Sequence, residues 1–451
     1  MKIHFISIGG SVMHQLAIAL HKKGYVVTGS DDEIFEPAKT NLEKEGLLPK
    51  TIGWQPDIIT KNIDAIILGM HAKTDNPELQ KAKEIGLKIY SFPEYIYQES
   101  LNKIRVAIGG SHGKTTTTSM VMHVLKQCHK EFDYLVGAKL EGFEQSVNIT
   151  NAPIVVCEAD EYPASAIERK PKFHFLFPHI AVITGIAWDH INIFPTFENY
   201  KEQFIIFINK IEKGGILIYN EDDVVLKNIV MENKRNDIRY QAYTLPIHKI
   251  ENGKTTITIE GLTKEIKVFG NHNLLNLNAA YFVCKELNIN AAHFVNAITN
   301  FTGASKRLEL LASNATTNVY RDFAHAPSKV IATINAVKQQ YNNRKLIAVL
   351  ELHTFSSLNE NFMKEYNGAM EKADVAVVFY SKHALELKRM PLLPKEKVIQ
   401  GFAKTGLTVI NDKEELMKFL YTQDYSNTNL LLMSSGNYDG LDVIQFAKEI
   451  A

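Results

Sequence analysis

A short apolar strand that runs straight into a glycine-rich turn and a helix is the strongest fold signal in this 451-residue chain. Arg105 and the apolar residues at 106–108 (VAI) are followed at 109–119 by GGSHGKTTTTS. Glycines allow the close backbone approach that a bound phosphate needs, and the first turn of a helix favours anions. The pattern G-x-x-G-K-T from Gly110 to Thr115 therefore predicts a phosphate-binding loop.

The longer form of this motif, G-x-x-x-x-G-K-[ST], is absent, because Ile108 stands where its first glycine would lie. A threonine-rich helix start is the alternative interpretation, but four threonines in a row are poor helix chemistry without another purpose. The residues predicted to hold the phosphates of ATP are Gly110, Ser111, His112, Gly113, Lys114, Thr115 and Thr116.

Short β-branched runs alternate with helical stretches along the whole chain, which is typical of parallel sheets covered by helices. The length suggests about three domains. We predict an α/β protein of three consecutive domains: a Rossmann-like N-terminal domain at 1–102, a central P-loop ATPase domain at 103–302 and a Rossmann-like C-terminal domain at 303–451. The strand-rich patch at 253–270 is expected at the edge of the middle domain.

Composition excludes several classes of partner. The 50 Lys and Arg residues balance the 50 Asp and Glu residues, so no overall field favours nucleic acid or an anionic membrane. No apolar run approaches the length of a membrane span, and the first residues do not resemble a secretory signal. The 3 cysteines are scattered, which favours the reducing cytoplasm. Monomer and dimer both remain open.

The N-terminal strand ends in a glycine turn, Ser7 to Ser11. Ser7 and Val12 occupy two of the glycine places of G-x-G-x-x-G, so the turn alone leaves a phosphate site and a plain turn equally open. Ser30 and Asp31 end the second strand, where an acidic residue often meets a ribose hydroxyl.

Two later strand ends carry acidic residues or histidine. One apolar strand ends in Glu158, Asp160 and Glu161, and another is followed by Asp189 and His190. A solvated acidic turn is the alternative for the first, and a structural histidine for the second. Ligands of α/β sheets bind at the carboxyl ends of strands, and Mg²⁺ prefers hard oxygen ligands. We therefore predict a Mg²⁺ site formed by Thr115, Glu158 and His190.

Six motifs in a fixed order carry a family resemblance: GSHGKTTTT, EADE, DH followed by FENYKEQF, GNHNLLNLNAA, KRLE and DFAHAP. Together they resemble the ATP-dependent Mur ligases of peptidoglycan assembly, and the similarity runs along essentially the whole chain. The resemblance implies a UDP-sugar-binding domain, an ATPase domain and an amino-acid-binding domain. It also implies activation of a carboxylate as an acyl phosphate, which an amine then displaces.

The resemblance assigns roles to individual residues of this chain. Lys114, Glu158 and His190 are implied as catalytic. The UDP-N-acetylmuramate site is expected at Gly9, Gly10, Ser11, Val12, Ser30, Asp31 and His71, further ATP contacts at Asn273, Asn276, Arg307, Asp322 and His325, and peptide contacts at His353, Ser435, Gly436 and Asn437. A helix N-cap remains open for Asn273, and a surface ion pair for Arg307.

Local sequence features distinguish two branches of the family. EPAKTNLEKEGL, EADEYPASAIERKPKFHFLFP and DHINIFPTFENYKEQF resemble the murein peptide ligase branch, which joins L-alanyl-γ-D-glutamyl-meso-diaminopimelate to UDP-N-acetylmuramate in peptidoglycan recycling. The alternative is the branch that adds L-alanine in de novo synthesis, whose usual GIGGxGM is altered here at Ser7 and Val12. Ala326 and the LELHTFSS segment depart from the tripeptide branch.

Two other classes of protein fit the sequence less well. A folylpolyglutamate-synthase-like ligase is disfavoured by the α/β domain that precedes the phosphate loop. A nucleotide-binding regulatory protein without ligase activity is disfavoured by the retention of Lys114, Glu158 and His190.

Overall fold

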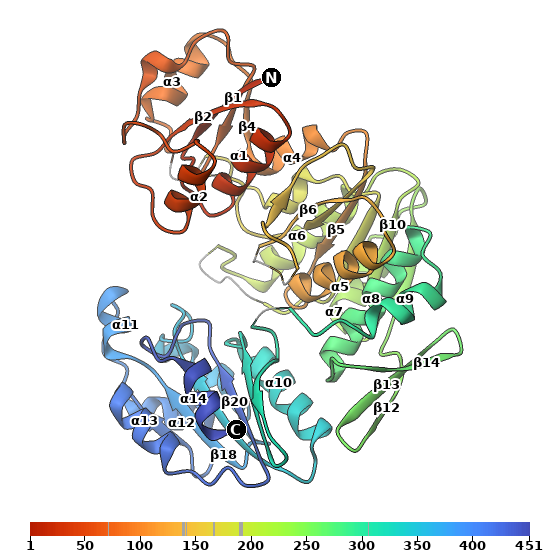
Figure 1. Ribbon diagram of the computed structural model, residues 1–451, viewed down its shortest axis with the longest axis vertical. Coiled ribbons are helices and arrows are strands. Elements are labelled where there is room, and N and C mark those ends of the chain that lie inside the picture. The colour runs from red at the N-terminus through yellow and green to blue at the C-terminus, as the bar shows by residue number, and fades with distance from the viewer. Residues whose placement is uncertain (71, 138–139, 141, 166, 189–192, 305) are drawn as a thin grey trace. The chain divides into compact units, whose positions relative to one another are not determined.

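The structure is a computed structural model that describes residues 1–451 except 71, 138–139, 141, 166, 189–192 and 305 (Figure 1). The described residues form sheets of four, seven, three and six strands. They divide into two compact units, unit 1 with Met1–Thr244 and Asn276–Phe294, and unit 2 with Leu245–Leu275 and Val295–Ala451. None of the described helices is both long and apolar enough to cross a membrane.

The N-terminal sheet has the strand order β2-β1-β3-β4, and all its pairs are parallel. Because side chains alternate along a strand, Ile3 and Phe5 of β1 pack with Leu16 of α1, whereas Ile6 packs with Leu79 of α3. Helices therefore cover both faces of this sheet. Its elements are β1 (Lys2–Ile6), α1 (Met13–Lys22), β2 (Val26–Ser30), α2 (Ala38–Lys44), η1 (Pro56–Ile58), β3 (Ala65–Leu68), α3 (Pro77–Glu84), β4 (Ile89–Ser91) and α4 (Phe92–Glu99).

The seven-stranded sheet has the order β11-β10-β9-β5-β8-β6-β7 and is parallel except for β7. The strand before the phosphate loop, β5, lies at its centre and is buried from its second residue onward. The elements are β5 (Ile104–Gly109), α5 (Lys114–Gln127), β6 (Asp133–Leu135), β7 (Val147–Asn148), β8 (Ile154–Glu158), η2 (Lys172–Phe175), β9 (Ile180–Ile183), α6 (Phe197–Asn209), β10 (Ile216–Asn220), α7 (Val224–Glu232), β11 (Arg239–Tyr243), α8 (Asn271–Glu286) and α9 (Ala291–Ile298).

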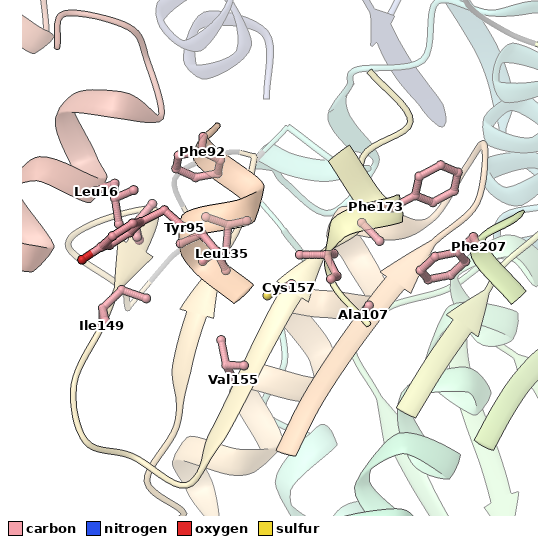
Figure 2. Packing of buried hydrophobic residues seen from close by; sticks show 14 of the residues in the cluster. Leu16, Phe92, Tyr95, Ala107, Leu135, Ile149, Val155, Cys157, Phe173 and Phe207 are labelled. Carbon is pink, nitrogen blue, oxygen red and sulfur yellow. The ribbon is translucent and has the colours of Figure 1, made fainter. Parts of the chain in front are cut away.

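One apolar cluster joins these two sheets within unit 1. Figure 2 shows Leu16 of α1 and Tyr95 of α4 beside Leu135 and Ile149, and the cluster continues to Phe207 of α6. Helix α1 also contacts β7. Burial of such side chains contributes roughly 1.5–3 kcal/mol each, so this cluster fixes the N-terminal sheet against the central one.

Unit 2 contains a six-stranded sheet of order β15-β16-β20-β17-β18-β19, parallel except for β15, and a small antiparallel sheet β12-β13-β14. The first comprises β15 (Glu309–Ser313), β16 (Thr317–Asp322), α10 (Pro327–Gln340), β17 (Lys345–Glu351), η3 (Glu360–Tyr366), β18 (Val375–Phe379), α11 (Lys382–Leu387), α12 (Lys395–Phe402), β19 (Thr408–Ile410), α13 (Lys413–Tyr421), β20 (Thr428–Met433) and α14 (Val443–Ile450). The second comprises β12 (Ile247–Glu251), β13 (Lys254–Ile259) and β14 (Leu262–Ile266).

Buried Gln340 fastens the small sheet to α10. Its side-chain oxygen accepts the Thr255 hydroxyl at 2.8 Å, and its amide nitrogen donates to the Gly253 carbonyl at 2.6 Å. These bonds explain why the patch at 253–270, expected at the edge of the middle domain, groups with unit 2. The domain boundaries at 102 and 302 remain predictions.

We predict that Gly270→Ala destabilises unit 2 more than Gly261→Ala does. Both glycines have positive φ, +86° and +80°, but a Cβ at 270 would lie 2.4 Å from Ala336 Cβ, whereas one at 261 meets nothing within 4 Å. Backbone strain costs about 1–2 kcal/mol in either variant, and overpacking adds about 1–3 kcal/mol at 270. Denaturant unfolding of both variants measures the difference. Equal losses of unfolding free energy would show that Ala336 shifts to accommodate the new Cβ at no cost in stability.

Candidate active site

Three neighbouring strands of the seven-stranded sheet bring the nucleotide-site candidates together. β5 lies between β8 and β9 and is parallel to both. In the β5–β8 pair Ile108 lies opposite Glu158, and in the β5–β9 pair Gly109 lies opposite Ile183. The phosphate loop and Glu158 therefore emerge at one edge, the carboxyl edge where α/β sheets bind ligands.

The loop needs its glycines. Gly110 has φ +124°, and a Cβ there would lie 2.2 Å from the Thr184 hydroxyl oxygen. Gly113 has φ +84°, and its Cβ would lie 2.2 Å from Asn276 Oδ1. The Ser111 amide donates to the Gly185 carbonyl at 2.9 Å, and the Thr184 hydroxyl donates to the His112 carbonyl. The loop between β5 and α5 is thus held tightly against the end of β9.

Lys114 is the first residue of α5, and its side chain forms hydrogen bonds at the phosphate loop. Its ammonium donates to the Gly110 carbonyl at 2.7 Å and to Glu161 Oε2 at 2.7 Å. Burial by itself lowers the pKa of Lys114, but the charges of Glu161 and Asp160 and the hydrogen bond to Glu161 raise that pKa above its ordinary value. The side chain therefore remains a cation at the mouth of the loop.

Thr115 and Glu158 supply oxygens that suit a hard divalent cation. The Thr115 hydroxyl donates to Glu158 Oε1 at 2.8 Å, and the Gly137 amide donates to Glu158 Oε2 at 3.0 Å. A hydroxyl and a carboxylate at one strand end match the ligands of Mg²⁺. The third predicted ligand, His190, lies outside the described residues. Within the described part of the chain no group of three His, Cys, Asp or Glu side chains is arranged to hold a metal.

The rest of the threonine run serves the helix. Thr116 is 6% exposed, and Thr117 and Thr118 are fully buried in α5. The run therefore combines one hydroxyl at the loop with three small β-branched residues that fit the buried side of the helix.

The two predicted adenine residues differ in their surroundings. Asn276 reaches the loop at Gly113. Asn273 lies inside α8, which begins at Asn271, and its side-chain amide donates to the Phe269 carbonyl at 3.0 Å. Asn273 is therefore not the N-cap of α8, and its side chain fixes the start of that helix.

The predicted UDP-sugar residues surround the turn between β1 and α1. The amides of Ser7 and Ile8 donate to the Ser30 carbonyl at 2.9 and 3.0 Å, and the Gly9 amide donates to Asp31 Oδ2 at 2.7 Å. The structure thereby brings the turn residues Gly9, Gly10, Ser11 and Val12 to the end of β2. His71 lies outside the described residues.

Ser30 has a structural partner that the sequence did not reveal. Its hydroxyl donates to Glu78 Oε2, and Glu78 also accepts the Gln55 amide at 2.6 Å and lies 3.3 Å from His4 Nε2. All three side chains of Ser30, Glu78 and His4 are fully buried. The Ser30 hydroxyl is thus directed into the fold, while Asp31 holds the glycine turn.

In unit 2 the predicted residues Arg307, Asp322 and His325 lie near one another. Buried Asp322 accepts the amides of Leu308 and Ala324 at 2.5 and 2.6 Å, and the Arg307 guanidinium lies 4.7 Å from the centre of the Phe323 ring. Burial raises the pKa of Asp322, although Arg307 and the two amides oppose that shift. Asp322 therefore orders the turn that presents Arg307, whose guanidinium has a cation–π contact with Phe323. The phosphate contact of Arg307 and the alternative of a surface ion pair both remain predictions.

The predicted peptide residues surround a buried carboxylate, Glu351, at the end of β17. Glu351 accepts the Ser434 hydroxyl and the Tyr438 amide, the latter at 2.9 Å. Burial raises the pKa of Glu351, against the opposing hydrogen bonds and the charge of His353. A Cβ on Gly436 would lie 2.7 Å from His353 Cγ. His353 thus lies against the turn that carries Ser435, Gly436 and Asn437.

Sequence reasoning missed Glu161 as a partner of Lys114 and did not single out Glu78 or Glu351. It also missed Tyr200, whose hydroxyl donates to Glu161 Oε1 at 3.2 Å. Glu161 was visible as the last acid of the EADE motif, but nothing in the spacing separated it from Glu158. The partners of Glu78 and Glu351 lie more than twenty residues away along the chain, so no local pattern marks them.

Family models match the chain in three consecutive segments. The Mur ligase family, catalytic domain matches residues 2–102, the Mur ligase middle domain matches 108–284, and the Mur ligase, glutamate ligase domain matches 306–436. These segments correspond to the four-, seven- and six-stranded sheets, and they confirm the predicted three-domain α/β architecture.

Individual relatives agree with this. A UDP-N-acetylmuramate–L-alanine ligase of Persephonella marina is 30% identical over 467 aligned residues, covering 99% of this chain and 97% of the relative. A UDP-N-acetylmuramate–alanine ligase structure from Thermotoga maritima shares the fold with a TM-score of 0.68 at 22% identity, over 100% of this chain and 98% of that one. A murein peptide ligase structure from Psychrobacter arcticus has a TM-score of 0.62 at 20% identity, again over 100% and 98%.

The strand–loop–helix at Lys114, the oxygens at Thr115 and Glu158, and the full-length relatives point to one conclusion. The chain belongs to the Mur ligase family, and it is an ATP-dependent ligase that forms a carbon–nitrogen bond.

Proposed function

We propose that this enzyme joins L-alanine to the carboxylate of UDP-N-acetylmuramate with ATP, in the de novo synthesis of peptidoglycan. The supporting observation is the full-length similarity to ligases named for that reaction. This is the alternative that the sequence left open, and the relatives favour it over the tripeptide reaction. The reaction belongs in the cytoplasm, the compartment that the scattered cysteines predict.

The phosphate loop would neutralise the reacting anions. A carboxylate and a triphosphate repel each other unless cations lie between them. Lys114 and the backbone amides of the loop would bind the phosphates, and Thr115 and Glu158 would hold Mg²⁺, whose positive charge lowers that repulsion. Gly9 to Val12 with Asp31 would bind the nucleotide sugar, and Asn276 would contribute to the ATP site of unit 1. Arg307, Asp322 and His325 of unit 2 remain predicted ATP contacts.

The tripeptide ligase remains a second candidate because of one cavity in unit 2. It has a volume of about 450 Å³ and lies at the ends of β18 and β19, lined by cationic and acidic side chains that include Lys382, Lys413, Glu386 and Asp439. A peptide that carries carboxylates and an ammonium group would match this mixed lining, whereas L-alanine would fill a small part of it.

We predict that Lys114→Ala lowers kcat for ATP-driven ligation by about 10²-fold or more, the usual size of one lost transition-state donor. Lys126→Ala is the matched control, because Lys126 lies at the far end of the same helix and donates to Gly142. Steady-state kinetics of both variants provide the measurement. Equal activity of the two would refute the phosphate role of Lys114.

We predict that Glu158→Gln raises the Mg²⁺ concentration needed for half-maximal activity, since one carboxylate oxygen becomes an amide. Asp160→Asn is the control, because Asp160 lies in the same turn but pairs with Lys172 at 2.7 Å. Mg²⁺ titrations of the two variants test this. A Glu158→Gln curve that overlays the parent would assign Glu158 to the fold alone.

We predict that L-alanine supports turnover with UDP-N-acetylmuramate held saturating, and that Lys382→Ala leaves its kcat/KM unchanged. If the tripeptide is the true amine, its remote charged groups contribute binding energy that orients the nucleophile. L-alanine would then be a poor substrate, and Lys382→Ala would lower kcat/KM for the tripeptide alone. The assay measures ADP release with each amine, and turnover of only the tripeptide would select the second candidate.

A further inference from the structure

A buried carboxylate lies directly behind the cation of the phosphate loop. Glu161 is fully buried, three residues after the end of β8. Its Oε2 accepts the Lys114 ammonium at 2.7 Å, and its Oε1 accepts the Tyr200 hydroxyl at 3.2 Å. A buried carboxylate is stable only when it is paired and hydrogen-bonded, and Glu161 has a partner on each oxygen.

The hydrogen bonds continue from Tyr200 back into the loop. The Tyr200 and Ser111 hydroxyl oxygens are 2.9 Å apart, and Ser111 Oγ also accepts the Ala187 amide at 2.8 Å. An ionised carboxylate only accepts hydrogen bonds, so the Tyr200 proton points to Glu161. Ser111 must then donate to Tyr200. The donor and acceptor of each hydrogen bond are thus defined in the series that runs from the Ala187 amide through Ser111 and Tyr200 to Glu161.

Tyr200 is itself fixed by packing. It is fully buried on α6, and its ring lies 5.3 Å from that of Phe194 and 5.2 Å from that of Phe204, measured between centroids. A ring held on both sides cannot follow a moving hydroxyl partner. These hydrogen bonds are therefore anchored in the core of unit 1 through the Tyr200 ring.

The arrangement restricts a side chain that is otherwise flexible. An ammonium group has three N–H donors, and that of Lys114 uses one on Gly110 and one on Glu161. One donor then remains for a phosphate oxygen. The side chain of Lys114 is 15% exposed and that of Glu161 is 1% exposed, so the pair is shielded from competing water on the Glu161 side.

Glu158 and Glu161 lie in one acidic turn but have different partners. Glu158 accepts the Thr115 hydroxyl and the Gly137 amide, neither of which is charged. Glu161 has the charged Lys114 and the buried Tyr200 as partners. If the Thr115 hydroxyl turned its hydrogen bond away from Glu158, both oxygens could hold a cation, whereas Glu161 already pairs with the Lys114 ammonium.

We propose that Glu161 is a positioning residue of the phosphate loop, which with Tyr200 and Ser111 holds the Lys114 ammonium in place for the terminal phosphates of the nucleotide. The proposal rests on the proposed phosphate role of Lys114. Glu161 contacts no substrate in this scheme and acts only through Lys114.

The test is calorimetric binding of ADP and AMP to the intact enzyme, followed by kinetics. The loop lysine reaches the β- and γ-phosphates. Glu161→Gln should therefore weaken ADP binding by about tenfold, as expected for one misplaced charged hydrogen bond, and leave AMP binding unchanged. Tyr200→Phe, which keeps the ring and removes only the hydroxyl, should shift ADP binding in the same direction by a smaller factor. Glu168→Gln is the control, because Glu168 pairs with exposed Lys170.

Other outcomes separate the alternatives. Equal losses for ADP and AMP in both variants would show a structural effect on the whole loop and overturn the proposal. Tighter ADP binding by Glu161→Gln would also overturn it, since Glu161 would then compete with phosphate for Lys114. If Glu161→Gln does not fold, the ADP and AMP affinities of Tyr200→Phe decide. A parent enzyme that binds no ADP would instead contradict the proposed function.

Discussion

Parallel pairing between β5 and β8 fixes the geometry on which the nucleotide site depends. It places Ile108 opposite Glu158, so the phosphate loop and the acidic turn begin at the same level of the sheet. A shift of two residues would move Glu158 by about 6.6 Å, at 3.3 Å per residue, and break its contact with Thr115. A shift of one residue would turn the buried side chains of β8 to the wrong face. The apolar core of the sheet therefore also specifies the active-site geometry.

Local patterns were sufficient to predict the parts of the site that lie on one strand–turn–helix. The G-x-x-G-K-T loop, the start of α5 at Lys114 and the acidic strand end at Glu158 follow from glycine conformation and strand periodicity. The parts that escaped prediction join distant segments. Tyr200 and Glu161 are 39 residues apart, and Thr255 and Gln340 are 85 apart. Such pairs are selected by tertiary packing, which leaves no periodic signal in the sequence.

Burial distinguishes acids that look alike in the sequence. Glu158 is partly exposed at its strand end, whereas Glu161, Glu78 and Glu351 are at most 1% exposed. Desolvation of an unpaired carboxylate is costly, so each buried acid has hydrogen-bond donors from separate segments. Glu78 joins β2 to the loop at Gln55, and Glu351 joins β17 to the turn after β20. These carboxylates therefore order the loops around the predicted substrate sites.

The difference between buried and exposed positions also explains why the motifs alone favoured the tripeptide branch, while the full-length relatives favour L-alanine. EPAKTNLEKEGL contains α2, where only Ala38 and Leu42 are buried within the helix. Similarity there reflects a helix surface, which tolerates substitution at little cost in stability. We predict that selectivity for the amine depends on charges at the strand ends of unit 2, where the LELHTFSS segment departs from the tripeptide pattern. The mixed charges near Lys382 and Asp439 would suit a longer amine substrate. Each charge that a substrate covers loses water, and an opposite charge on the substrate would offset that cost.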